Sequence, residues 1–244
     1  SSLAVMPSAT FPKKCKPFFL TPLPLQFGVG VPSGCELVAA AITAHLNSNQ
    51  SHIDISCDAR NAFNSWCRSQ MWDTLTTHFP SLVSLVKLMY GSPSSILFFE
   101  PGSGLTEVLN SVGCKQGCSL GSFLFCLAIH PILTQLQTEF PDLLIIAYCD
   151  DVHIVGDPAR AITAYHRWSY LYGSTLQGEL RNDKGIAFAP NPNLDGPLLH
   201  SLGLPPVMKL THVGLRVLGA PIGHMSFQAA FASTNVDFIL TDLS

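Results

Sequence analysis

The chain has 244 residues, of which 47% are hydrophobic and only 12% charged, and its formal net charge is −3. This apolar content predicts a buried core of one or two domains and excludes an intrinsically disordered protein. Lysine and arginine together number only 13, a weak electrostatic basis for a stand-alone nucleic-acid-binding protein, because such proteins gain affinity by neutralising phosphates.

No stretch of the sequence predicts a membrane span. The longest apolar run, from Leu120 to Leu133, includes His130 and Pro131 and is shorter than the roughly 20 residues that cross a bilayer. Eight cysteines occur without a CxxC pair, which favours reduced core thiols in an intracellular protein over a disulfide framework or a zinc site. The chain begins "SSLAVMPSAT", without an initiator Met or a signal pattern, so we expect a fragment or a processed piece.

The first half of the chain alternates helical and strand patterns. A Gly-bearing turn precedes an apolar helix from about Glu36, and the alternating residues 52–57, "HIDISC", predict a strand. Apolar residues then recur at helical spacing from Asn61 to Phe79, and a second helix is expected from Pro80 to Tyr90. The sequence "SSILFFEPGSGLTEVLNS" has two β-prone runs around a Pro-Gly-Ser-Gly turn and predicts a hairpin.

The second half predicts the rest of a mixed fold. "GCSLGSFLFCLAIHPILTQL" is apolar on nearly all sides and predicts a buried helix, and two β-rich runs follow at 143–149 and 152–155. A helix from Pro158 to about Leu176, a strand in "GIAFAP", an irregular loop at 190–206 and a β-prone run at 212–223 complete the order. This order predicts an α+β fold in which an antiparallel sheet is backed by helices.

Two adjacent carboxylates, Asp150 and Asp151, interrupt the apolar run from Leu143 to Val155. Ionised carboxylates are costly in an apolar interior unless they are exposed, paired or bound to cations. A tight hairpin would present both at its tip, although Asp is also a common residue of ordinary turns. Asp58, at the end of the strand predicted at 52–57, can project toward the same tip. Three carboxylates from two strand ends suggest a site for hard cations such as Mg²⁺, two of which can stabilise an in-line phosphoryl displacement.

Three sequence motifs carry a family resemblance. "AYCDDVHIVG" resembles the YxDD motif of reverse transcriptases, "CDARNAFNS" their first palm motif, and "GCKQGCSLGSFLFCLAIHPIL" their Gln-Gly motif and its helix. The motifs occur in the family's order and are most similar to those of non-long-terminal-repeat retrotransposons. "ELRNDKGIAF" is similar to the later Lys-bearing motif, and "GLRVLGAPIG" to the Leu-Gly segment near the primer grip. The resemblance implies a polymerase palm with partial fingers.

The resemblance also implies a domain layout and an activity. Residues 1–50 would be partial fingers, 51–190 the reverse transcriptase palm, and 191–244 the end of the palm with the primer-grip region, without a thumb. The activity would be RNA-directed DNA synthesis, in which two Mg²⁺ or Mn²⁺ ions assist transfer of dNTPs onto the 3′-hydroxyl of a DNA primer paired with an RNA template. The basic fingers strands and the thumb lie outside the resemblance, which accounts for the low positive charge and leaves open the activity of this segment alone.

Two other classes of protein stay open. One is a catalytically silent retroelement remnant that binds nucleic acid or protein, which the low positive charge favours and the three intact carboxylates oppose. The other is an RNA-dependent RNA polymerase palm, against which Tyr148 of the YxDD motif and the aromatic Phe63 argue.

The motifs assign roles to the acidic residues and to one aromatic residue. Asp58 and Asp150 match the catalytic, metal-binding carboxylates, and Asp151 matches the second acid of the turn and completes the metal site. Asp54 does not match, because only Asp58 has an aromatic residue five positions later, and we expect Asp54 to be an exposed strand residue. That aromatic, Phe63, takes the position of the steric gate against a ribose 2′-hydroxyl; alternatively it is a core residue where a helix begins.

Further positions are assigned by the same resemblance. Gln116 and Gly117 would bind substrate before the buried helix, or belong to an ordinary loop. Lys184 would lie near the departing pyrophosphate, or be a solvated surface lysine. Leu218 and Gly219 would belong to the primer-grip hairpin, where the glycine is also consistent with a simple β-turn.

Overall fold

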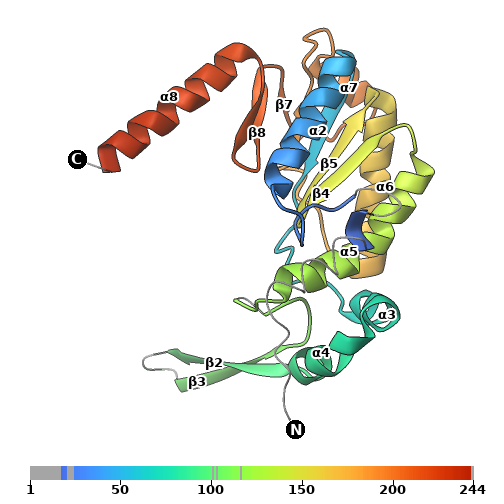
Figure 1. Ribbon diagram of the computed structural model, residues 1–244, viewed down its shortest axis with the longest axis vertical. Coiled ribbons are helices and arrows are strands. Elements are labelled where there is room, and N and C mark those ends of the chain that lie inside the picture. The colour runs from blue at the N-terminus through green and yellow to red at the C-terminus, as the bar shows by residue number, and fades with distance from the viewer. Residues whose placement is uncertain (1–17, 21–24, 101, 103, 116, 243–244) are drawn as a thin grey trace.

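The structure is a computed structural model that describes residues 18–20, 25–100, 102, 104–115 and 117–242, with side chains described as far as residue 234. Its centre is a five-stranded sheet in the order β4, β5, β1, β6, β7 (Figure 1). The strands are β4 (Leu144–Tyr148), β5 (Asp151–Gly156), β1 (Ile53–Cys57), β6 (Ile186–Phe188) and β7 (Lys209–Thr211). The strands from β4 to β6 pair antiparallel, as the sequence predicts, but β7 pairs parallel to β6. Three residues carry too little pattern to reveal this edge strand.

Helices cover both faces of the sheet. On one face, alternate residues of β1 such as Ile53 and Ile55 enter the main core with α5 (Gly121–Glu139) and α6 (Pro158–Leu176). On the other face, Val155 and Phe188 pack with α2 (Gly34–Ser48) and with the hairpin of β8 (Gly214–Val217) and β9 (Ala220–Gly223). Figure 1 shows α2 on the opposite side of the sheet from α5 and α6. The fold is therefore α+β, as predicted.

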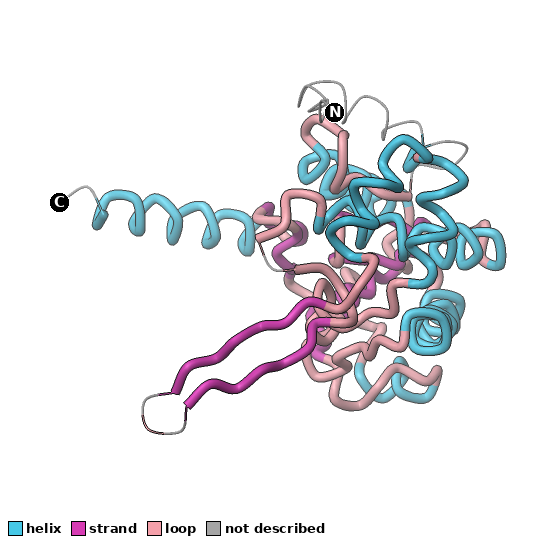
Figure 2. Tube along the Cα trace, turned by 90° about the horizontal axis from the view of Figure 1, so that it is seen from below, coloured by secondary structure: helices cyan, strands magenta, loops and turns pink. Residues whose placement is uncertain are grey.

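The remaining elements extend from this body. α3 (Ser69–His78), η1 (Pro80–Leu82) and α4 (Val83–Tyr90) lead to the ribbon of β2 (Ser94–Glu100) and β3 (Gly104–Asn110), and α7 (Gly196–Ser201) precedes β7. The ribbon and α8 (Met225–Asp242) project toward the same side of the molecule (Figures 1 and 2). Within the described part of the chain, no helix combines the length and hydropathy that a membrane span requires.

The ribbon of β2 and β3 is apolar and exposed on both faces. Its pairing of Phe98 with Thr106 and of Phe99 with Leu105 confirms the predicted hairpin. Phe99 is 75% exposed. The other exposed apolar side chains of the ribbon are Ile96, Leu97, Phe98, Leu105, Val108 and Leu109. A two-stranded ribbon alone is marginally stable in water, so its apolar faces need a cover.

Two of the predicted elements differ from the structure. Residues 61–68 form turns, and α3 begins only at Ser69, because local contacts compete with the helix: the Trp66 indole donates to the carbonyl of Phe63. The loop expected at 190–206 contains α7, whose N-cap Asp195 accepts a hydrogen bond from the backbone N–H of Leu198. The Asp-Gly-Pro sequence at that point is a helix-start signal that the loop prediction overlooked.

Candidate active site

The three predicted carboxylates gather at one end of the sheet. Asp58 directly follows β1, and the register that pairs Cys57 with Val152 places Asp58 beside Asp151. The hairpin tip lies one residue earlier than predicted: Tyr148 pairs with Asp151, so Cys149 and Asp150 form the two-residue turn. Asp150 therefore lies in the turn itself, and Asp151 begins β5.

Asp150 and Asp151 both have raised pKa values. Burial raises the pKa of Asp150 above its ordinary value, and the charges of Asp151 and Asp58 raise it further, against the opposing effect of a backbone hydrogen bond. Burial also raises the pKa of Asp151, where the charge of His153 opposes the shift and the charge of Asp58 adds to it. Such a cluster of like charges is stabilised by a bound cation.

The donor chemistry of this cluster fits a hard divalent ion. Asp58, Asp150 and Asp151 supply only carboxylate oxygens, the ligands that Mg²⁺ and Mn²⁺ accept. Among the residues with described positions, no group of three or more His, Cys, Asp or Glu side chains lies close enough together to hold a metal ion. Because Mg²⁺ takes few protein ligands and leaves positions for substrate phosphates, a pair of these carboxylates is a sufficient protein contribution.

Asp54 is not the exposed strand residue that the sequence predicts. It is fully buried, and its Oδ2 and Oδ1 atoms lie 3.0 and 3.1 Å from Nδ1 of His153. The register of β1 and β5 pairs Ser56 with His153, so Asp54 and His153 are diagonal neighbours on the same sheet face. The expectation was wrong because α2 and the β8–β9 hairpin cover this face, which strand alternation alone cannot reveal.

Phe63 lines a cavity of about 290 Å³, and Ser122, which also lines it, hydrogen-bonds Cys149 next to Asp150. Its half-buried ring packs against Phe125 of α5, with ring centroids 5.0 Å apart. The N–H of Cys114 donates to the carbonyl of Phe63, so a hydrogen bond links the first palm motif to the loop of the Gln-Gly motif. The cavity is lined by Phe63, Asn64, Cys114, Lys115, Gly117, Cys118, Gly121 and Ser122. A ring at the edge of such a cavity can contact a bound sugar as well as the core.

The two residues of the Gln-Gly motif differ in what the structure describes. Gln116 lies outside the described residues. Gly117 has a φ of +79°, and no heavy atom lies within 4 Å of the position that a Cβ would occupy. This left-handed conformation favours glycine, and the open space beside it permits close approach of a ligand to the backbone.

Lys184 is exposed and belongs to a turn that is anchored at Asp58. The N–H of Lys184 donates to the carbonyl of Arg181, and the N–H of Arg181 donates to the carbonyl of Asp58 over 2.7 Å. Hydrogen bonding to Asp183 raises the pKa of Arg181, and the charge of Asp58 contributes to the same shift. Arg181 is therefore a cation near the site that the motifs did not single out, although it belongs to the quoted "ELRNDKGIAF" segment.

Leu218 and Gly219 form the two-residue turn between β8 and β9. Their φ angles of +49° and +90° match the left-handed turn that closes tight hairpins. Leu218 packs on the sheet face covered by α2 and the β8–β9 hairpin, so the structure joins this hairpin to the palm sheet. Gly219 thus lies in the turn of a β-hairpin, which is consistent with both possibilities that the sequence left open, a primer-grip hairpin and a simple β-turn.

Known proteins resemble this chain in sequence and in fold. A family model described as reverse transcriptase (RNA-dependent DNA polymerase) matches residues 21–167. The retrotransposable element SLACS 132 kDa protein of Trypanosoma brucei gambiense is 30% identical over 136 residues, which are 55% of this chain and 11% of that protein. The chain thus spans only a small part of this relative.

A solved structure shares the fold. The structure of telomerase from Candida albicans in complex with a TWJ fragment of telomeric RNA aligns with a TM-score of 0.62 over 89% of this chain and 37% of that chain. The sequence identity is 10%, so this likeness shows the fold alone, and it confirms the α+β polymerase palm. Because the family match covers more than half of its length, the chain belongs to the reverse transcriptase (RNA-dependent DNA polymerase) family, of the non-long-terminal-repeat retrotransposon type that its motifs predict.

Proposed function

We propose that this chain forms the palm of a retroelement polymerase that copies an RNA template into DNA. The carrying observation is the position of Asp58, Asp150 and Asp151 at the adjoining ends of β1 and β5. In this proposal residues 51–190 are the palm, residues 1–50 belong to the fingers and residues 191–244 end the palm at the primer grip. This domain division remains a prediction.

The proposed reaction is nucleotidyl transfer onto a DNA primer. Reverse transcriptases use divalent metal ions, and two such ions, when bound, stabilise the attacking 3′-oxygen and the leaving pyrophosphate oxygen. Asp58 and Asp150 would hold the ions, and Asp151 would keep the site negative enough to attract them. Phe63 would lie under the sugar of the incoming dNTP, and Gly117 would let its backbone approach the nucleotide. Lys184 would offer its ammonium group to the departing pyrophosphate.

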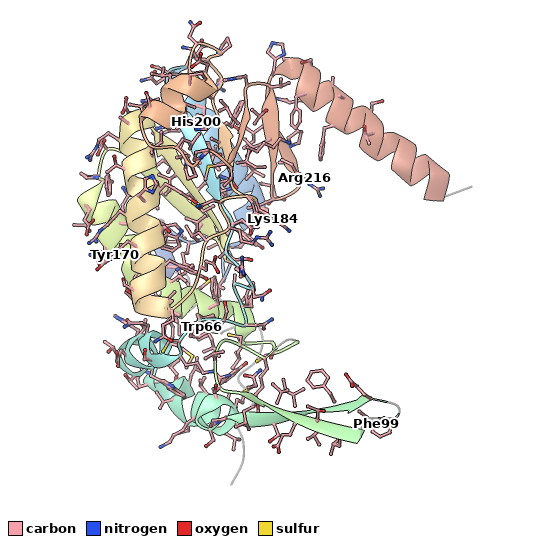
Figure 3. All side chains as sticks on the ribbon, turned by 180° about the vertical axis from the view of Figure 1, so that it is seen from behind. Trp66, Phe99, Tyr170, Lys184, His200 and Arg216 are labelled. Atoms are coloured by element: carbon pink, nitrogen blue, oxygen red, sulfur yellow. The ribbon has the colours of Figure 1, made fainter. Side chains whose placement is uncertain are left out.

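Two cations, Lys184 and Arg216, lie on the side of the molecule that a nucleic-acid partner would occupy in this proposal. Figure 3 shows Lys184 and Arg216 on the side toward which α8 and the β2–β3 ribbon project. The Arg216 guanidinium lies 5.7 Å from the ring centroid of Phe231 in α8, which ties the projecting helix to the β8–β9 hairpin. In this proposal a template and primer would bind on this side, between the β2–β3 ribbon and α8, and would face the three carboxylates.

A primer-extension assay on poly(rA)·oligo(dT) tests the proposal. We expect a version of the chain extended at both ends to incorporate dTTP in the presence of Mg²⁺ or Mn²⁺, and Asp150→Asn to abolish incorporation. Asp157→Asn is the matched control and should retain activity, because it changes an exposed N-cap acid of α6 at the opposite end of β5 from Asp151. Equal extension by wild type and Asp150→Asn would reject the catalytic assignment.

The second candidate is a catalytically silent domain that binds nucleic acid or protein. It is favoured by the low count of 13 basic residues and by the wide exposure of the apolar β2–β3 ribbon. The same assay separates the two, because a silent domain would bind the primer-template without extending it in every version of the chain.

A further inference from the structure

One buried hydroxyl group of α6 has no hydrogen-bond partner among the described residues. Tyr172 of α6 is 1% exposed, and its hydroxyl contacts no donor or acceptor among the residues that the structure describes. Its ring is tightly held: it packs against Trp168, with centroids 5.4 Å apart. Buried hydroxyl groups are usually hydrogen-bonded, because an unpaired one has lost its bonds to water and gained nothing.

The chain around Tyr172 is shaped to receive the ring. A Cβ on Gly178 would lie 2.2 Å from Cε1 of Tyr172 and within 3 Å of two further ring atoms, so only glycine fits at position 178. The ring position is therefore set by backbone on one side and by the indole of Trp168 on the other. A change that removed only the hydroxyl would leave this packing in place.

Tyr172 lies at the end of α6 that adjoins the catalytic strands. One turn further on, the carbonyl of Leu176 accepts a hydrogen bond from Cys67, and Leu180 forms a bridge with Ala59 beside Asp58. The raised pKa of Tyr172 is consistent with a position near the acidic residues. Burial raises the pKa of Tyr172 above its ordinary value, and the charge of Asp150 is the second cause of the shift.

We propose that Tyr172 is a positioning residue for Asp150, and that its buried hydroxyl donates a hydrogen bond to the Asp150 carboxylate when that carboxylate holds a divalent cation. The inference rests on the proposed function, in which Asp150 is a metal ligand. Carboxylates that bind metal ions are normally oriented by hydrogen-bond donors behind them, and loss of such a donor weakens metal binding about 10- to 100-fold. Tyr172 combines an unpartnered buried hydroxyl, rigid packing and a place in the last turn of α6, the segment that leads to the bridge beside Asp58.

The test compares Tyr172→Phe with Tyr165→Phe, its matched control. Tyr165 lies on the same helix and is equally buried, but its hydroxyl already donates to Oδ1 of Asn182. Mn²⁺ affinity is measured by calorimetry and Tm by thermal unfolding, for both variants, for Asp150→Asn and for wild type. We expect Tyr172→Phe to weaken Mn²⁺ binding at least tenfold with an unchanged or higher Tm. Tyr165→Phe should lower Tm and leave Mn²⁺ affinity as in wild type.

The outcomes separate this inference from the proposed function. If Asp150→Asn weakens Mn²⁺ binding but Tyr172→Phe binds as wild type does, the role of Tyr172 is wrong and the metal assignment stands. If both tyrosine variants lose affinity and Tm together, the effect is general destabilisation and the role of Tyr172 is again wrong. If Asp150→Asn binds Mn²⁺ as wild type does, the metal assignment fails and the inference fails with it.

Discussion

The Nδ1 atom of His153 lies 3.0 Å from Oδ2 of Asp54, and the two side chains are almost completely enclosed between the sheet and its cover. Burial alone would lower the pKa of His153, but the charge and the hydrogen bond of Asp54 outweigh burial, and the charge of Asp151 adds to them, so the net shift is upward. Asp54 therefore favours the protonated form of His153, which lies two strand positions from Asp151.

We expect His153→Leu to lower the free energy of unfolding by about 3–5 kcal/mol, because it leaves the buried charge of Asp54 without a partner. The double variant Asp54→Leu/His153→Leu should recover most of this loss, because apolar side chains of similar volume need no partner. Urea unfolding measures both values. A double variant as unstable as the sum of the single variants would show that the two residues do not interact.

A surface ion pair provides the control for this experiment. Arg160 and Asp142 also form a close pair, with Nη2 2.7 Å from Oδ1, but both side chains are about half exposed. Arg160→Leu should change the free energy of unfolding much less than His153→Leu, because water solvates the carboxylate that remains. Equal effects would mean that burial is not what makes the Asp54–His153 pair important.

The sequence predicted the acidic site better than its surroundings. The positions of Asp58, Asp150 and Asp151 in the fold were predictable because each is a polar residue that adjoins or begins an apolar strand, where local pattern determines position. The burial of Asp54 was not predictable, since its cover comes from segments some 15 residues before it in the chain and more than 150 residues after it. Strand alternation identifies which residues share a face but not which face is solvated.

The other differences from the sequence have local causes. Of the helix predicted from Asn61 to Phe79, only the part from Ser69 forms. The preceding residues form turns, because the side chains of Ser65 and Trp66 hydrogen-bond to the backbone of this segment. The parallel pairing of β7 depends on a distant partner, β6, and its three residues carry no register signal. The long periodic segment predicted from Pro158 to about Leu176 agrees with α6.

Acid should destabilise the protein through His130. Burial, and to a lesser extent the charge of His78, lowers the pKa of His130 to about 4, whereas in the unfolded chain it is about 6.5. The folded state therefore binds fewer protons between these values, so stability is complete above pH 6.5 and is lost as the pH falls toward 4. His130→Leu should flatten this part of the pH profile measured by urea unfolding. A slope identical to that of wild type would show that His130 does not cause it.

Lys184 should affect turnover without affecting stability. It is exposed, and its backbone, not its side chain, anchors the turn beside Asp58. In an extended chain that polymerises, we expect Lys184→Ala to lower kcat for dNTP incorporation about 10- to 100-fold at unchanged Tm, because a cation near the leaving pyrophosphate assists the transfer. Lys209→Ala, at an equally exposed lysine in β7, is the control. Equal kcat values for the two variants would make Lys184 an ordinary surface residue.

Phe63 should select the sugar of the incoming nucleotide. Its half-buried ring borders the cavity of about 290 Å³, so a ribose 2′-hydroxyl placed there would overlap the ring or displace it. Such overpacking costs on the order of 1–3 kcal/mol, which corresponds to about a ten- to hundredfold preference for the deoxyribonucleotide. In an extended chain that polymerises, Phe63→Val should raise kcat/KM for rNTPs relative to dNTPs by about this factor.

A variant of Phe125, whose ring packs against Phe63, distinguishes a steric gate from a core residue. Phe125 packs against Phe63 but is 1% exposed and belongs to the core of α5. Phe125→Val should therefore lower Tm and reduce the use of both nucleotides alike, because it leaves a void in the core without enlarging the sugar site. If Phe63→Val behaves in the same way, with a fixed ratio of kcat/KM for rNTP and dNTP and a lower Tm, then Phe63 is a core residue and not a steric gate.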